Sequence, residues 1–163
     1  MANEITAVIF TKNEALNLKD CVESLSGIDK IVVVDSQSTD GTIEIARALN
    51  LDIIQFRWNG KYPRKKQWAI ENIKSSNWLL MFDADLRATP KFISEIKNYV
   101  EQTLDVGAYC PISYRFMKKK LRFGTKVKYL GLLDRRFCVY PDVEPENLGY
   151  GDIEFHYQPK YHG

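Results

Sequence analysis

The sequence contains few cysteines and no long apolar run. Its three cysteines, Cys21, Cys110 and Cys138, are odd in number, widely spaced and include no Cys-x-x-Cys pair. This pattern indicates neither a disulfide framework nor a zinc site built from paired thiolates, and it favours a reducing compartment. The N-terminus lacks a basic segment before its first apolar run, and no stretch approaches the roughly 20 apolar residues of a membrane-spanning helix. We therefore expect a cytoplasmic protein.

An excess of charge of one sign is also lacking. The chain has 23 Lys and Arg against 21 Asp and Glu, and its formal net charge is +2. Such a balance gives no indication of a nucleic-acid partner. The 163 residues, 45% of them hydrophobic, suffice for one domain with a substantial core. No longer repeat or low-complexity tract divides the chain, so we expect a single domain over residues 1–163.

The first two thirds of the chain alternate apolar runs with helical patterns. Apolar runs at 5–10, 31–34, 51–56 and 78–82 predict four strands. Asp40 is the expected N-cap of the second helix, and Pro63 and Pro90 are expected in the first turns of the next two. The pattern predicts an α/β fold with a mostly parallel sheet flanked by helices, which binds ligands beyond the carboxyl ends of its strands.

The pattern changes after about Val106. Shorter segments rich in Tyr, Phe and β-branched residues follow, broken by Gly and Pro. They predict a C-terminal mixed or antiparallel extension of the sheet.

Acidic residues follow three of the predicted strands. Glu14 comes after the first strand, Asp35 after the second, and Asp83 and Asp85 after the fourth. Alternate carboxylates that leave a strand can converge on one hard cation, which in turn neutralises a diphosphate. The alternative is a turn that caps the helix opened by Pro90, but two unpaired carboxylates repel each other unless something positive joins them.

Three motifs together resemble a known family, the inverting family 2 glycosyltransferases with the GT-A, or Rossmann-like, fold. Their order and spacing are similar to the family's Thr-x-Asn-Glu, Asp-to-Ser-Thr-Asp-Gly-Thr and Asp-x-Asp segments. The resemblance extends from about Ile5 to Phe92. The motifs are Phe10-Thr11-Lys12-Asn13-Glu14, then Val34-Asp35-Ser36 with Ser38-Thr39-Asp40-Gly41-Thr42, and Asp83-Ala84-Asp85. The sequence around Asp35 and the segment Lys66-Gln67-Trp68-Ala69 are most similar to those of enzymes that add sugars to lipopolysaccharide core or related bacterial glycans.

The resemblance implies a site for a nucleotide-sugar donor, commonly UDP-linked, and a divalent cofactor, Mn²⁺ or Mg²⁺. Asp83 and Asp85 are the implied metal ligands, Asp35 is implied to bind the base or ribose, and Lys66 to face the diphosphate. The implied nucleotide-sugar site comprises Thr11, Asn13, Glu14, Asp35, Ser36, Lys66, Asp83 and Ala84. Residues 1–105 correspond to the nucleotide-sugar-binding half and 106–163 to the acceptor-side half, which we expect to be truncated.

Sugar transfer requires a general base that removes a proton from the acceptor hydroxyl. The family places a carboxylate well downstream of Asp-x-Asp, and Asp152 and Glu154 are the candidates. Strand alternation would put both on one face. His156 is either an assisting base or a structural residue. The cluster Lys61, Arg64 and Lys65 either joins the diphosphate site or forms a solvated helix face.

A basic and apolar segment without acids runs from Arg115 to Lys128. It suits a phosphorylated, glycan or lipid-linked acceptor, or peripheral contact with the inner face of a membrane. A hairpin with a solvated basic side is the alternative.

Three other functions compete with sugar transfer. A sugar-1-phosphate nucleotidyltransferase shares the layered fold, but it should carry a Gly-rich phosphate loop where this chain has Thr11-Lys12-Asn13-Glu14. A haloacid-dehalogenase-like phosphatase should carry Thr or Val where this chain has Arg87. A catalytically inactive nucleotide-sugar-binding module is compatible with the short C-terminal half.

Overall fold

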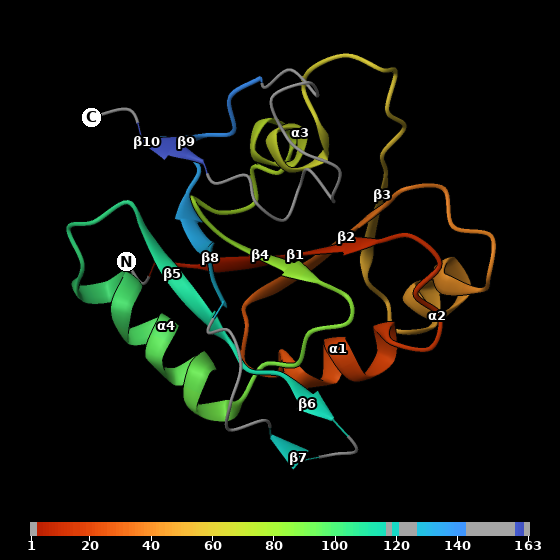
Figure 1. Cartoon of the computed structure of the whole chain (residues 1–163), viewed down its shortest axis with the longest axis horizontal. Helices are drawn as coiled ribbons and strands as arrows, with labels where there is room; N and C mark the ends of the chain where they lie inside the picture. The colour runs from red at the N-terminus through yellow and green to blue at the C-terminus, as the bar shows by residue number, and fades with distance from the viewer. Residues whose placement is uncertain (1–2, 117–118, 121–126, 143–158, 162–163) are drawn as a thin grey trace.

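A computed structural model of the chain (Figure 1) describes residues 3–116, 119–120, 127–142 and 159–161. A six-stranded sheet has the strand order β3-β2-β1-β4-β8-β5, in which β1 to β4 are parallel and β8 runs antiparallel between β4 and β5. This confirms the predicted α/β fold with an antiparallel extension. The strands of the sheet are β1 (Ile5–Thr11), β2 (Lys30–Asp35), β3 (Asp52–Gln55), β4 (Trp78–Asp83), β5 (Gly107–Ile112) and β8 (Val127–Asp134).

In the described part of the chain, helices cover both faces of the sheet. In Figure 1, α1 and α4 lie below the sheet and α3 lies above it. Two short antiparallel pairs, β6 with β7 and β9 with β10, lie outside the main sheet. The helices are α1 (Leu18–Ser24), α2 (Thr42–Ala48), α3 (Lys65–Asn72) and α4 (Pro90–Gln102), and the short strands are β6 (Arg115–Phe116), β7 (Lys119–Lys120), β9 (Cys138–Val139) and β10 (Lys160–Tyr161).

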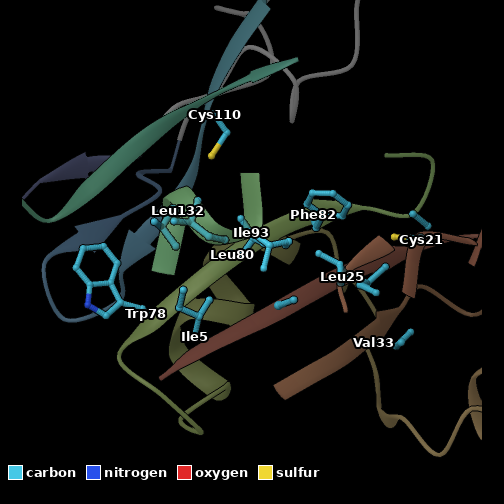
Figure 2. Close-up of a cluster of buried hydrophobic side chains, with 14 of the residues drawn as sticks. Ile5, Cys21, Leu25, Val33, Trp78, Leu80, Phe82, Ile93, Cys110 and Leu132 are labelled. Atoms are coloured by element: carbon cyan, nitrogen blue, oxygen red, sulfur yellow. The ribbon is translucent and has the colours of Figure 1, made fainter. Parts of the chain in front are cut away.

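The core has two halves because side chains alternate across each strand. Ile5, Ala7 and Ile9 of β1 pack with apolar residues of α1, α2 and α4. Val8 and Phe10 face the other way and pack with α3. Figure 2 shows members of the first half. Burial on both faces accounts for the nearly continuous apolar runs of the central strands.

Two helix starts differ from the sequence-based expectation. The helix expected at Pro63 begins at Lys65, because Arg64 has an extended backbone (φ −77°, ψ 168°) and stands outside the helix as its N-cap. The N-cap of α2 is Gly41, at φ 86°, rather than Asp40. Asp40 still accepts a 3.1 Å hydrogen bond from the backbone N–H of Thr42. The start of α4 at Pro90 is as predicted.

The C-terminal extension joins the parallel strands through β8. The Tyr129 hydroxyl donates a 3.0 Å hydrogen bond to the backbone carbonyl of Met81 in β4. Gly131 is required beside this ring, since a Cβ there would lie 2.7 Å from two Tyr129 ring atoms.

No helix in the described part of the chain has the length and apolar character needed to cross a bilayer.

Candidate functional site

The predicted donor-site residues lie where the order of strands in the sheet reverses, between β1 and β4. The chain builds β1, β2 and β3 toward one edge and then returns to place β4 on the other side of β1. Thr11 is in register with Asp35 across β1 and β2, and Phe10 with Asp83 across β1 and β4. The loops that leave these strands therefore share one edge (Figure 1). Open α/β sheets bind ligands at such switch points.

Asp35 is the centre of a buried polar network. Its side chain is fully buried, and each carboxylate oxygen accepts two hydrogen bonds. Oδ1 accepts from the hydroxyls of Thr11 (2.8 Å) and Ser38 (2.5 Å), and Oδ2 accepts from the Ser38 backbone N–H (2.8 Å) and Gln55 Nε2 (3.1 Å). Burial alone would raise the pKa of Asp35, but the bonds from Ser38, Thr11 and Gln55 outweigh it and lower that pKa below its ordinary value. Asp35 thus fastens the ends of three parallel strands together as an anion.

Asn13 extends this network between the β1–α1 and β2–α2 loops. Its backbone N–H donates to the Ser38 hydroxyl at 2.8 Å, and its side-chain Oδ1 accepts from the Thr39 backbone N–H at 2.8 Å. Asn13 has a positive φ of 58°, a conformation that Asn tolerates better than most residues. Its amide oxygen therefore holds the neighbouring loop.

Lys12 also crosses between the two loops. Its Nζ donates to the carbonyls of Ser36 (2.7 Å) and Gln37 (3.0 Å). Gln37 has a φ of 59°. Within the described residues the side chains of Ser36 and Gln37 have no hydrogen-bond partner, so these two polar side chains remain available at the edge.

Glu14 lies at the end of the same interlocked region. The backbone N–H groups of Glu14 and Ala15 donate to Thr42 Oγ1 (2.8 Å) and Asp40 Oδ2 (3.0 Å). The Glu14 carboxylate accepts a 2.8 Å bond from Asn17 Nδ2. The β2–α2 motif therefore holds the start of α1 through its own side chains, which is a structural use of the Ser-Thr-Asp-Gly-Thr segment.

The Asp83-Ala84-Asp85 segment forms a turn at the end of β4. Asp83 is half-buried, Ala84 is buried and Asp85 is exposed. The Asp83 carbonyl accepts from the Leu86 backbone N–H at 3.0 Å and from the Cys21 thiol, whose Sγ is 3.9 Å away. The turn thus closes on itself and rests on α1, with the Asp85 side chain toward solvent.

The Cys21 thiol, which contacts the turn, has a raised pKa. Burial raises the pKa of Cys21 to about 12, Arg87 lowers it, and Asp85, Asp83 and Glu14 raise it further. The part of the chain that the structure describes contains no group of three or more His, Cys, Asp or Glu side chains able to hold a metal. A pair of carboxylates still fits Mg²⁺ or Mn²⁺, because such ions commonly take one or two protein carboxylates and complete their shell with substrate phosphates and water.

The basic cluster approaches the site from α3. Lys65 Nζ lies 5.5 Å from the ring centroid of Phe10, at the end of β1. Lys66 is the next residue of the helix and is half-buried. Arg64 instead stacks on the exposed Trp58, with its Cζ 5.6 Å from the ring centroid. The structure therefore places Lys65 at the end of β1, whereas the family resemblance implies Lys66 for the diphosphate.

The candidate bases fall outside this description. Asp152, Glu154 and His156 lie outside the described residues, as does most of the segment between Phe116 and Val127.

Two residues absent from the sequence-based site are prominent in the structure. Gln55 bonds to Asp35 from 20 positions away, a distance at which no local pattern links them. Arg87 contacts both the turn and α1, and its spacing two residues after Asp85 was the available signal.

Comparisons with known proteins agree with this geometry. The model of the family described as glycosyl transferase family 2 matches residues 6–150, and the chain therefore belongs to that family. An uncharacterized glycosyltransferase of Rickettsia felis is 38% identical over 147 residues, which are 86% of this chain and 51% of the relative. The lipopolysaccharide core biosynthesis glycosyltransferase LpsC of Rhizobium meliloti is 39% identical over 89 residues, which are 51% of this chain and 32% of LpsC.

A solved structure confirms the GT-A fold. Glucosyl-3-phosphoglycerate synthase from Mycobacterium tuberculosis, in complex with Mn²⁺, UDP and glucosyl-3-phosphoglycerate, superposes with a TM-score of 0.52. The match covers 64% of this chain and 42% of the synthase at 19% identity, so the likeness concerns the fold alone. The chain spans 33% to 52% of the length of the Rickettsia glycosyltransferases that it matches.

Proposed function

We propose that this chain carries the donor site of a metal-dependent inverting glycosyltransferase. Its donor is a nucleotide-diphosphate sugar, UDP-linked, and its acceptor is a glycan or lipid-linked glycan of a bacterial surface polysaccharide or lipopolysaccharide. The observation that carries the proposal is the Asp83-Ala84-Asp85 turn, which stands at the switch point beside the network around Asp35 in a family 2 member. The UDP and Mn²⁺ bound to the mycobacterial synthase support the choice of donor and metal. The similarity to LpsC, a lipopolysaccharide core biosynthesis glycosyltransferase, supports the choice of acceptor.

In the proposed donor site, different segments bind the metal, the nucleoside and the diphosphate. Asp83 and Asp85 hold a Mn²⁺ or Mg²⁺ ion, which neutralises charge on the departing diphosphate when it is bound. Thr11, Asn13, Glu14, Asp35 and Ser36 shape the nucleoside pocket, and Ala84 completes the nucleotide-sugar site. Lys66 and its neighbour Lys65 orient the diphosphate as cations at the start of α3.

The acceptor half comprises residues 106–163 in this proposal. Asp152 or Glu154 removes the proton from the attacking acceptor hydroxyl. The basic segment from Arg115 to Lys128 receives an anionic acceptor or meets anionic headgroups at the inner face of the membrane, since each exposed Lys or Arg adds on the order of 1 kcal/mol there. Cosedimentation with vesicles of anionic and of neutral lipid tests that contact, and equal recovery with both would remove it from the proposal.

Calorimetry with Mn²⁺ and UDP tests the donor site. We expect UDP to bind only with the metal present, and Asp85→Ala to abolish that binding. Asp52→Ala is the matched control, because Asp52 is an exposed carboxylate paired with Lys30 at 2.9 Å at the opposite end of the parallel strands. Metal-independent binding, or normal binding by Asp85→Ala, would contradict the proposed site.

Donor hydrolysis separates an enzyme from an inactive binding module. The parent chain should release UDP slowly from a UDP-sugar. Asp152→Ala or Glu154→Ala should remove sugar transfer while sparing Mn²⁺–UDP binding. Binding without hydrolysis or transfer by the parent chain would favour the inactive module.

A further inference from the structure

Arg87 follows the metal-binding turn and contacts it on both sides of Asp85. Its Nη1 donates to the carbonyls of Ala84 (3.0 Å) and Leu86 (2.8 Å). The Ala84 carbonyl belongs to the peptide group that precedes Asp85, and the Leu86 carbonyl lies one residue after it, so one guanidinium nitrogen spans the segment that carries Asp85. Charge-assisted bonds of this kind are stronger than neutral ones.

The other terminal nitrogen of Arg87 points to α1. Nη2 lies 3.7 Å from Asp20 Oδ2 and 3.5 Å from Asn17 Oδ1. Asn17 in turn donates to the Glu14 carboxylate at 2.8 Å. The guanidinium therefore bridges the turn at the end of β4 to the helix that follows β1.

Helix α1 is a firm support for this bridge. Leu18 and Cys21 are fully buried in the core. Two further contacts join α1 to the same turn, the Cys21 thiol with the Asp83 carbonyl and the Ser24 hydroxyl, which accepts from the Ala88 backbone N–H at 3.0 Å. Arg87 is the member of this set that contacts carbonyls on both sides of Asp85 in the sequence.

We propose that Arg87 is a positioning residue that fixes the Asp85 turn and thereby strengthens divalent-metal binding. The inference rests on the proposed function, in which Asp85 binds the metal. Charge and geometry make opposite predictions for Arg87. A cation beside two carboxylates weakens metal binding by repulsion, whereas a preorganised turn strengthens it. The Arg87 side chain is 35% exposed, so water screens its charge, and the geometric effect dominates.

Substitution with Lys separates these two effects. Arg87→Lys keeps the charge but loses the planar fork, whose two terminal nitrogens contact the turn and α1 at the same time. Arg87→Gln loses the charge as well. Lys19→Gln is the matched control, because Lys19 is an exposed cation of α1 paired with Glu23 at 3.9 Å and does not touch the turn.

The first measurement is Mn²⁺ affinity in the presence of UDP, from the electron paramagnetic resonance signal of free Mn²⁺. We expect Arg87→Lys and Arg87→Gln each to weaken binding about tenfold, the loss expected for charge-assisted hydrogen bonds, and Lys19→Gln to match the parent chain. Unchanged binding by Arg87→Lys, with unchanged or tighter binding by Arg87→Gln, would overturn the positioning role.

The second measurement needs no metal. The Leu86 amide hydrogen is held by the Asp83 carbonyl at 3.0 Å, so its hydrogen exchange reports the order of the turn. In the metal-free protein, Arg87→Lys should speed this exchange about tenfold and leave amides of the central strands unchanged. Unchanged Leu86 exchange would sink the positioning role by itself. Faster exchange together with a parent chain that binds no Mn²⁺–UDP would instead count against the proposed function.

Discussion

The Thr11 hydroxyl donates a 2.8 Å hydrogen bond to Asp35 Oδ1 and so joins the ends of β1 and β2 below the candidate donor site. The same carboxylate accepts from Ser38 and Gln55, so all of its bonds are made to the protein itself. A buried carboxylate can accept about four hydrogen bonds. Asp35 therefore holds together the loops that form the nucleoside pocket in the proposed function.

Asp35→Asn should make stability less dependent on pH. The folded pKa of Asp35 lies below its unfolded value of about 3.9, so its stabilisation is present above that value and is lost as pH falls through the folded pKa. At pH 7 we expect a loss of about 1–3 kcal/mol in the free energy of unfolding. Urea titrations between pH 7 and pH 2.5 should show the difference between parent and variant shrinking below about pH 4.

Asp52→Asn serves as the control for that titration, because Asp52 is exposed and its partner Lys30 lies at the opposite end of the parallel strands. We expect it to change stability by less than about 0.5 kcal/mol. A constant difference between parent and Asp35→Asn from pH 7 to pH 2.5 would show that the charge of Asp35 does not contribute.

Gln37→Gly should stabilise the fold. Gln37 has a φ of 59°, in the left-handed region that costs a non-glycine residue roughly 1 kcal/mol or more. Glycine removes this cost but raises the entropy of the unfolded chain, which leaves a gain of about 0.5 kcal/mol. Thermal and urea unfolding measure it. Ser36→Gly, one residue earlier and without a positive φ, should destabilise instead, and equal effects at the two positions would contradict the assignment of strain.

The parallel half of the fold could be predicted because its signals are local. Ile31–Val34 is an unbroken apolar run, and the structure buries this part of β2 against helices on both faces. Pro90 marks the start of α4 by its fixed φ. The carboxylates at the strand ends followed from the same periodicity, because parallel strands place their carboxyl ends together.

The remaining features depend on contacts between residues distant in sequence. The place of β8 between β4 and β5 is set by pairings such as Leu80 with Leu132, about which the local pattern near residue 130 says nothing. The bond from Gln55 to Asp35 likewise joins two strands that only the folded sheet brings together. The sequence marks Arg87 only as a departure from the phosphatase motif, because its partners at α1 precede it by about 70 positions.

Gln67→Met should weaken the attachment of α3 to the C-terminal region. Gln67 is buried, and its Oε1 accepts a 2.7 Å bond from the Tyr140 backbone N–H. Methionine has a similar size but leaves this donor unsatisfied, at a cost of about 1–3 kcal/mol. Chemical unfolding measures the loss. Asn72→Ala is the control on the same helix, because Asn72 is exposed. A loss no larger than that of Asn72→Ala would contradict the role of Gln67.

All three cysteines should be unreactive in the folded protein. Burial raises the pKa of Cys21 to about 12 and the pKa values of Cys110 and Cys138 to about 11 each. At pH 8 the reactive thiolate is then on the order of one part in a thousand or less of each thiol, and the side chains are also shielded from reagent. Ellman's reagent should release almost no chromophore within minutes from native protein and three equivalents per chain in urea. Cys21→Ala should reduce the urea value to two and leave the native value unchanged, whereas one fast equivalent that disappears in Cys21→Ala would show that the packing of α1 beneath the Asp83 turn opens readily.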